Sequence, residues 1–284
     1  GSRDPYKVSA HGTIPVSALS GGKTGESMDL SLQLDNAGLD VLTFLTPYVT
    51  EADGPIQGAV KIGGTLDAPT VNGDIAVKNG TIKFKDTAYP LANINADLAF
   101  KGRSAVLSGS GTMDKKGKKN PGSISLDGKA AWSGRSLDSY SLAADFSGLY
   151  LNCPYYDGPI TGYVNVTPGD GRPKVSGLMQ VDTTVDIPLA LASSSEGPDL
   201  DLDFTLTLGN KVRLYNLALY DLMVNGSVTF QGNLNHPHPS GRFEATRGTV
   251  HYLDTNFRVT KAKADFSRYD SFLPYVDAEG FSRV

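Results

Sequence analysis

Apolar and polar residues alternate along most of the 284-residue chain, and this period of two constrains the fold more than any other feature. Residues 200–208 place five apolar side chains on one strand face and Asp or Thr on the other, and residues 28–34 and 94–100 repeat the pattern. Such strands bury one face and hydrate the other, whereas strands of a doubly covered parallel sheet are continuously apolar. The chain is therefore predicted to be all-β, with a sheet that is antiparallel or otherwise one-sided.

The composition agrees with a sheet that has one hydrated face. Hydrophobic residues make up 39% of the chain, below the roughly 45–50% usual in globular proteins. The net charge of −4 disfavours nucleic acid as a partner, because binding there depends on Lys and Arg that neutralise phosphates. No window of the sequence approaches the roughly 20 apolar residues that a membrane-spanning helix needs.

One segment departs from the strand pattern and predicts a short amphipathic helix near residues 37–49. Asn36 is expected to cap its N-terminus, and Pro47 is expected to kink or end it. Its apolar face is predicted to cap the core, with contact to a membrane or a partner as the alternative. The apolar residues recur at helical spacing: Leu39, Leu42, Leu45 and Val49.

A Gly-x10-Pro-x3-Gly motif occurs three times, starting at Gly58, Gly162 and Gly226. A further Gly follows seven residues later at Gly80 and Gly248, but Thr184 takes that place in the middle copy. The unequal intervals between copies rule out a solenoid of short fixed period. The motif therefore predicts recurring hairpin units in one longer sheet, near residues 54–100, 158–191 and 221–266.

Each part of the motif has a physical interpretation. The first Gly is expected to open a strand, and the Pro-containing stretch to turn the chain, since Pro fixes φ and cannot donate to a sheet. The second Gly is expected to start the return strand. The last Gly is expected to allow a turn with positive φ into another strand.

Candidate catalytic and metal-binding residues form no recognisable constellation. His236 and His238 flank a turn proline without a known metal-ligand spacing. Asp199, Asp201 and Asp203 share a strand face but lack the Gly and terminal Glu of a calcium loop, so a hydrated outer face is predicted for them. Neither a phosphate-binding loop nor a nucleophile elbow occurs. The chain is predicted not to be an enzyme, with no catalytic residue, metal site or cofactor.

Several motifs together resemble the TamB family and the wider AsmA-like group. Residues 54–58 (GPIQG) and 64–73 (GTLDAPTVNG) carry the resemblance in the first half, and residues 247–252 (RGTVHY) and 273–276 (LPYV) resemble the same family's C-terminal domain. The resemblance rests on Gly, Pro and apolar spacing over most of the chain. Residues 103–157 match nothing distinctive.

The resemblance implies a fold, a location and a role. Residues 1–284 would be a fragment of one elongated β-sheet curled into an apolar trough, a β-taco, related to bridge-like lipid-transfer proteins. The full-length protein would cross the periplasm of a two-membraned bacterium, with an inner-membrane anchor elsewhere in its chain. The implied roles are phospholipid transport between membranes and outer-membrane protein assembly with a BamA-like partner.

The trough interpretation assigns the alternating apolar residues to a distributed groove for phospholipid acyl chains. A dry β core is the alternative for the same residues, and a scaffold that pairs by β-augmentation is the alternative function. A surface adhesin or glycan binder is disfavoured, since Trp132 is the single tryptophan. The predicted groove residues are Ile75, Val77, Ile82, Phe84, Leu98, Phe100, Leu202, Phe204, Leu206, Val228, Phe230, Phe243, Val250 and Tyr252.

Overall fold

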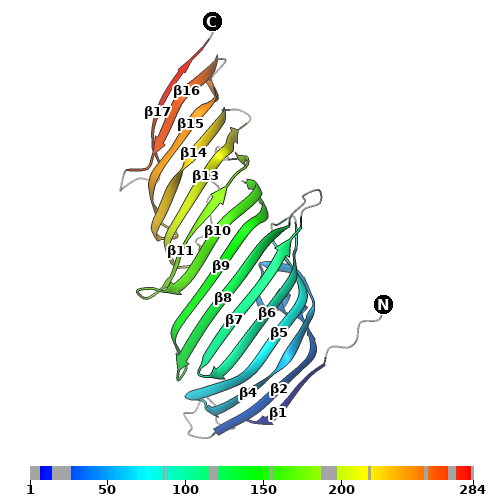
Figure 1. Cartoon of the computed structure of the whole chain (residues 1–284). Helices are drawn as coiled ribbons and strands as arrows, with labels where there is room; N and C mark the ends of the chain where they lie inside the picture. Colours follow the sequence, from blue (N-terminus) through cyan, green and yellow to red (C-terminus); the bar gives the residue numbers. More distant parts are fainter. Residues whose placement is uncertain are drawn as a thin grey trace. The chain divides into compact units, whose positions relative to one another are not determined.

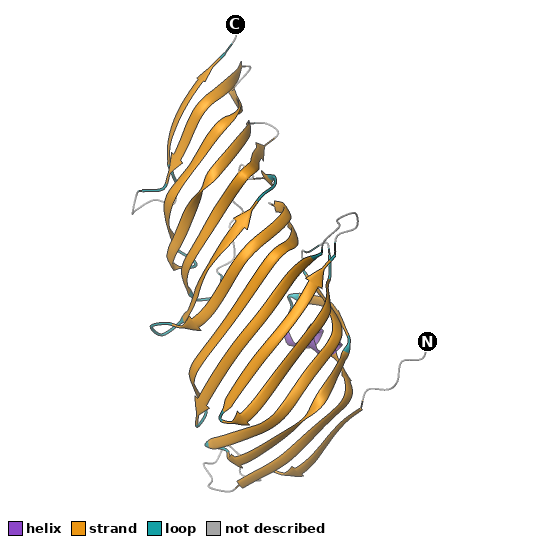
Figure 2. Ribbon diagram, viewed as in Figure 1, coloured by secondary structure: helices purple, strands orange, loops and turns teal. Residues whose placement is uncertain are grey.

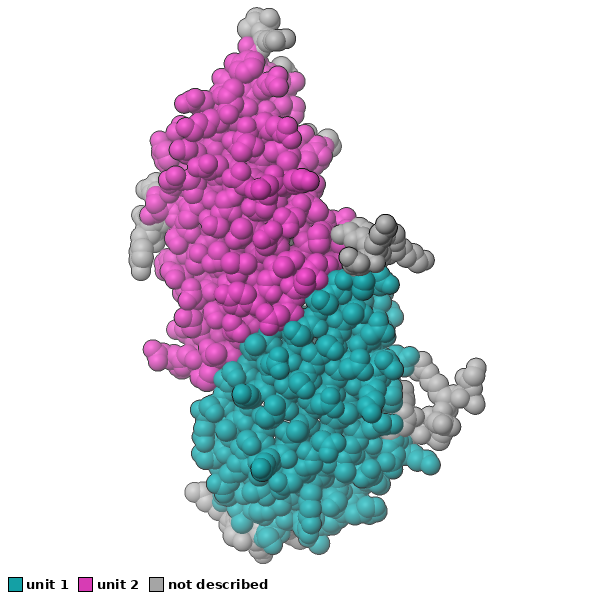
Figure 3. All heavy atoms as spheres, viewed as in Figure 1, with its two compact units in different colours: residues 1–144 teal, residues 145–284 magenta. Residues whose placement is uncertain are grey.

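The structure, a computed structural model, describes residues 7–14, 27–85, 87, 89–114, 121–153, 156–186, 197–216, 219–252, 255–267 and 273–282. Internal contacts divide the chain into Gly1–Ala144, here unit 1, and Asp145–Val284, here unit 2 (Figure 3). Each unit is described by itself. The prediction of one trough over the whole chain stays a prediction.

The fold is all-β, with 17 strands in one mixed sheet and one short helical segment (Figures 1 and 2), which confirms the predicted fold class. Strand β9, Ser136–Cys153, contains the boundary between the units. The other strands of unit 1 are β1 Lys7–Thr13, β2 Ser27–Gly38, β3 Val49–Asp53, β4 Pro55–Thr65, β5 Ala68–Phe84, β6 Leu91–Gly102, β7 Ser104–Met113 and β8 Gly122–Ser133.

In unit 1 the strands pair antiparallel in the order β1, β2, β4, β5, β6, β7, β8. Strands β3 and β4 lie end to end along β5, because β3 pairs with Thr81–Phe84 and β4 with Ala68–Val77. The helical segment forms the connection from β2 to β3, so it belongs to unit 1.

Unit 2 contains the two parallel pairings among the described strands, both made with β13. Strand β11 pairs antiparallel with β10 but parallel with β13, and the strands from β13 to β17 then alternate in direction. The short β12 also lies parallel to β13. The strands are β10 Tyr156–Pro168, β11 Pro173–Val181, β12 Val185–Asp186, β13 Asp201–Asn216, β14 Tyr220–Asn233, β15 His238–Tyr252, β16 Thr255–Asp265 and β17 Tyr275–Phe281.

The three copies of the Gly-x10-Pro-x3-Gly motif are three antiparallel hairpins with the same register. In β4/β5, Gly58 faces Ile75 and Val60 faces Gly73, so each Gly of the motif lies diagonally opposite the other. The spacing of the motif thus encodes strand register as well as a turn. The equivalent pairs are Gly162 with Met179 and Val164 with Gly177 in β10/β11, and Gly226 with Phe243 and Val228 with Gly241 in β14/β15.

The predicted roles of the first and last glycines are wrong in detail. Gly58 lies inside β4 instead of opening it, and Gly80 lies inside β5 beside a bulge, where Asn79 carries the positive φ of 52°. Gly248 also lies inside β15. Thr184 falls in the break between β11 and β12. The last position of the motif therefore marks an irregularity within a strand, because a bulge bends and twists the strand without reversing the chain.

The helical segment is shorter than the predicted 37–49. It consists of a 3-10 turn, η1 Leu39–Val41, and one α turn, α2 Leu42–Leu45. Asn36 lies within β2 at an irregularity between Leu34 and Ala37, which both pair with β4, and Val49 begins β3 by pairing with Phe84 of β5. Gly38 takes the N-cap position without a side-chain hydrogen bond. Within the part of the chain that the structure describes, no helix is long and apolar enough to cross a membrane.

Candidate functional site

The six predicted groove residues of unit 1 share one face of its sheet. Ile75 faces Leu98 and Val77 faces Ala96 across β5 and β6, while Phe100 faces Gly73. A bulge follows Val77, and a Cβ added to Gly80 would lie 2.9 Å from Val77 Cγ1, so Gly80 points to the same face. Strand alternation then places the two remaining residues, Ile82 and Phe84, on that face.

The sheet of unit 1 curls at the rim where the turns after β4 and β8 lie, and its apolar face is on the concave side of this curl. Trp132 Nε1 donates to the Pro69 carbonyl at 3.2 Å, and Arg135 Nε donates to the Leu66 carbonyl at 3.1 Å. Strands β6 and β7 separate β5 from β8 in the sheet, so these contacts require the sheet to curl. Register places Trp132 on the face of Phe100 and Ala105, inside the curl.

The predicted groove residues of unit 2 share a face as well. Leu202, Phe204 and Leu206 face Gly232, Phe230 and Val228 in turn across β13 and β14. Val228 is completely buried. On β15, Phe243 faces Gly226 and Val250 faces Tyr220. Tyr252 pairs with Thr255 at the end of β15, and its side chain lies outside the described residues.

A cavity of about 550 Å³ opens on this face of unit 2. Of the predicted groove residues, Leu206 and Phe243 line it. The other lining residues come from the strands of these two, β13 and β15, and from seven more, β9–β12, β14, β16 and β17, and are almost entirely aliphatic or aromatic. Lining residues that the prediction missed include Val181, Leu208, Val212, Val224, Ala245 and Ala262.

The missed lining residues follow from local irregularities. The apolar alternation of β13 is interrupted at Gly209–Lys211, where a bulge separates Leu208 from Val212. Both flanking residues are buried. Leu208 already ends the alternating run of residues 200–208 but is not in the predicted set, and extending the period of two across the interruption would have found Val212. Ala245 and Ala262 face each other across β15 and β16, and alanine carries too little hydropathy to mark a face by itself.

Tyr156 is the lining residue with a phenolic group at the β10 side of the cavity. Its hydroxyl donates to the Pro159 carbonyl at 2.6 Å, and burial raises the pKa of the phenol. The hydroxyl is thus neutral and already bonded at physiological pH. Tyr156 therefore offers a lipid mainly the apolar body of its ring.

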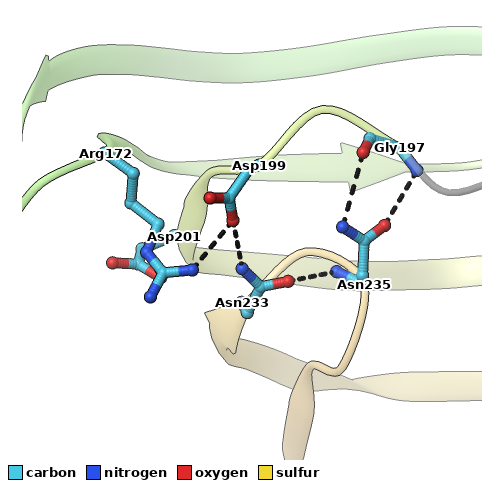
Figure 4. Close-up of polar contacts among 6 residues, drawn as sticks. All are labelled: Arg172, Gly197, Asp199, Asp201, Asn233 and Asn235. Atoms are coloured by element: carbon cyan, nitrogen blue, oxygen red, sulfur yellow. Dashed lines mark hydrogen bonds and ion pairs between the residues drawn. The ribbon is translucent and has the colours of Figure 1, made fainter.

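The opposite face of unit 2 is a polar surface of cross-strand ion pairs, and the three aspartates of residues 199–203 lie on it. Arg172 contacts Asp199 at 2.8 Å and Asp201 at 3.4 Å (Figure 4). Lys174 contacts Asp203 at 3.2 Å. Ion pairing accounts for these carboxylates, and the described residues contain no group of three or more potential ligands that could hold a metal ion.

The network in Figure 4 also ties together turns that are distant in sequence. Asn233 donates to Asp199 at 2.8 Å, and Asn235 donates its backbone N–H to the Asn233 side chain at 2.8 Å. The backbone N–H of Gly197 donates to Asn235 Oδ1 at 2.8 Å. The β10/β11 turn, the start of β13 and the β14/β15 turn therefore lie on the same rim of unit 2.

We expect the ion pairs of this surface to make unit 2 less stable in acid. Hydrogen bonds from Arg213 lower the pKa of Asp221, with both contacts at 2.7 Å. A carboxyl with a lowered folded pKa stabilises the fold above the unfolded pKa of about 3.9, and that contribution disappears as pH falls through the folded pKa. Asp221→Asn should lower the melting temperature at pH 7 and flatten its decline between pH 5 and 3, measured by circular dichroism. An unchanged pH profile would contradict this assignment.

Comparison with known proteins identifies the family. The family model described as the TamB C-terminal domain matches residues 6–121 and 188–284. These ranges cover most of the chain and include β1–β7 and β13–β17. A search of curated proteins and of solved structures finds no match. The unmatched middle contains the hairpin β10/β11 and Thr184, where the repeat itself departs from the other copies. The chain belongs to the TamB family.

Proposed function

We propose that the apolar face of this TamB-family chain binds the acyl chains of phospholipids and forms part of a conduit between the two membranes of a bacterial envelope. The family is one of envelope proteins with non-catalytic roles in transport and assembly. The observation that carries the proposal is the cavity of unit 2. Its apolar walls suit hydrocarbon and provide no converging polar groups for a soluble substrate.

The energetics favour a distributed site over a single binding point. An acyl chain gains about 0.8 kcal/mol for each methylene group that it buries. The lining residues of successive strands are chemically similar, for example Leu206 on β13, Val224 on β14 and Ala245 on β15. Because neighbouring positions offer similar contacts, a chain can shift along the face at small cost in free energy. Headgroups would remain outside, since burying a charge without a partner is costly.

Mass spectrometry of the purified chain tests the proposal. We expect phospholipid to copurify with the chain after detergent-free extraction from a two-membraned bacterium, and to be displaced by added phosphatidylethanolamine that carries a photoreactive acyl chain. Photocrosslinks should map to the tryptic peptides 175–211 and 214–242, which contain cavity residues. Absence of both copurifying lipid and crosslinks in these peptides would refute the proposal.

The exposed edge of unit 2 favours a second candidate function, a scaffold that pairs with a BamA-like outer-membrane protein. Among the described strands, β17 pairs with β16 alone, and Tyr275 and Val276 are 65% and 61% exposed. An open edge of this kind can accept a strand from a partner by β-augmentation.

Proline scanning of β17 tests the scaffold candidate. Neighbouring residues of a strand direct their N–H groups to opposite edges, so one of Asp277→Pro and Ala278→Pro removes an outward donor only. We expect that variant to lose capture by an immobilised BamA-like protein while it keeps its bound lipid. Capture of both variants at the level of the unchanged chain would exclude β17 as the pairing edge.

A further inference from the structure

The connection between β2 and β3 carries the three most exposed large apolar side chains among the described residues. Phe44 is 87% exposed, Leu45 is 73% exposed and Tyr48 is 70% exposed. Single exposed apolar residues are ordinary on protein surfaces, but adjacent ones in a short ordered segment mark a contact surface. The segment 41–48, which we call the Phe44 lip, therefore needs an apolar occupant.

The Phe44 lip is held on the apolar face of unit 1. Leu39, just before it, is 5% exposed, and its Cδ2 would lie 3.0 Å from a Cβ added to Gly80. A Cβ at Gly80 would also lie 3.5 Å from Ile94 Cβ. Because Gly80 shares the face of Val77, the helical segment is seated directly on the predicted groove side. Figure 2 shows this helix, in purple, against the sheet of unit 1.

The return from the Phe44 lip fixes it at one end of β5. Lys85 donates its backbone N–H to the Tyr48 carbonyl at 2.8 Å, and Val49 faces Phe84 in the β3–β5 register. Leu39 donates its backbone N–H to the Gly54 carbonyl at 2.9 Å. Backbone hydrogen bonds to the residues just before β4 and just after β5 thus hold both flanks of the segment, so it has a defined position beside the end of β5 at Phe84.

The surrounding charges favour an acyl chain over an anionic bilayer surface as the occupant. Asp40 lies within the helical segment, and Glu51 on β3 pairs with Lys83 at 3.1 Å. Lys85 follows β5 beside Tyr48, so two acidic and two basic residues surround the segment. An anionic membrane attracts uncompensated Lys and Arg and repels carboxylates. An apolar surface that adjoins a concave apolar face and has no net positive charge around it instead suits hydrocarbon that lies within the groove.

We propose that the Phe44 lip closes over the end of the unit 1 groove and holds an acyl chain against Ile82 and Phe84. The proposal rests on the proposed function, since it assumes that the groove binds phospholipid. It adds a specific retaining contact to an otherwise distributed site. Removal of the lip should weaken lipid contact in unit 1 and leave the cavity of unit 2 unaffected.

The test uses the Phe44→Asn/Leu45→Asn double variant and the photoreactive phosphatidylethanolamine described above, supplied in vesicles of phosphatidylethanolamine and phosphatidylglycerol. In the unchanged chain, crosslinks are expected in the tryptic peptide 24–61, which contains both lip residues, and in peptides 175–211 and 214–242. The double variant should lose about tenfold or more of the crosslinks in 24–61, because two large apolar contacts are removed. Crosslinks in the unit 2 peptides should stay constant.

Val106→Asn is the matched control. Val106 is 49% exposed and faces Lys129, on the side of the sheet opposite Leu107. It should leave every crosslink unchanged, and both variants should melt within about 2 °C of the unchanged chain, since exposed substitutions have small effects on stability.

Two crosslinking results would contradict the proposed role of the Phe44 lip. One is labelling of unit 2 without labelling of peptide 24–61, and the other is labelling of peptide 24–61 that survives the double variant. Phe44-dependent flotation with intact vesicles also overturns it, by showing a bilayer occupant. Loss of labelling in both units refutes the proposed function itself.

Discussion

Gly73→Ala is expected to destabilise unit 1 by about 3 kcal/mol or more, measured by urea denaturation. Gly73 has φ of +126°, a conformation that side chains with a Cβ rarely adopt. An added Cβ would lie 2.0 Å from the Ala59 carbonyl oxygen and 3.0 Å from Val60 Cα, both backbone atoms of β4. The strands cannot separate to relieve this contact without breaking the hairpin register. The substitution therefore combines backbone strain with a collision.

Gly102→Ala separates these two contributions. Gly102 also has a positive φ, +64°, but nothing lies within 4 Å of an added Cβ. It should cost about 1–2 kcal/mol, which is the strain of the left-handed conformation alone. Equal losses of stability in Gly73→Ala and Gly102→Ala would show that the close approach of β4 and β5 contributes nothing to the requirement for glycine.

Ala262→Asp is expected to weaken phospholipid binding in unit 2 by about thirtyfold or more. Ala262 lines the cavity and faces Ala245 and Ala278 across the neighbouring strands. In the absence of lipid, the new carboxylate can remain hydrated at the open side. An acyl chain that covers it must remove that water without supplying a hydrogen bond, which costs at least about 2 kcal/mol. Titration with a fluorescent acyl phospholipid measures the loss.

Ser240→Asp provides the control for charge alone. Ser240 is exposed on the polar face beside Arg242, and it faces Thr229 instead of the cavity. Binding should remain within about twofold of the unchanged chain, since exposed charges add little energy at this distance. Circular dichroism should show that both variants keep their strand content. An equal loss of phospholipid affinity in both variants would show that the added negative charge itself weakens binding, whether or not it lies on the apolar face.

The two faces of the sheet could be predicted because the alternation of apolar and polar residues along one strand does not depend on how that strand pairs with its neighbours. Ile75 and Leu98 illustrate this, since both follow their own strand's pattern and meet across β5 and β6. Alternation also predicted the face shared by Phe204 and Phe230. The residues marked as a groove thus share a face in each unit, while their contact with lipid stays a prediction.

The direction of strands and the curl of the sheet could not be read from the same pattern. Leu202 and Val175 would alternate identically in parallel or antiparallel strands, so nothing in the period indicates the parallel pairing of β11 and β13. The curl of unit 1 depends on Trp132 reaching the Pro69 carbonyl, a contact over 63 positions in sequence. Asn36 suggested a helix cap from local preference, but pairing of β2 with β4 overrides it.

The parallel step from β11 to β13 sets a rule for how such a chain can grow by insertion. Without that step, β13 would start at the far ends of the strands, and the β14/β15 turn would leave the rim where Arg172, Asp199 and Asn233 meet. Each added antiparallel strand moves the chain to the opposite rim of the sheet, and one parallel step cancels one such move. An insertion that leaves the following proline-containing turns on the same rim must therefore add an even number of antiparallel strands, or an odd number together with one parallel step. Homologues of different length should differ by such blocks, and single-strand insertions should be selected against.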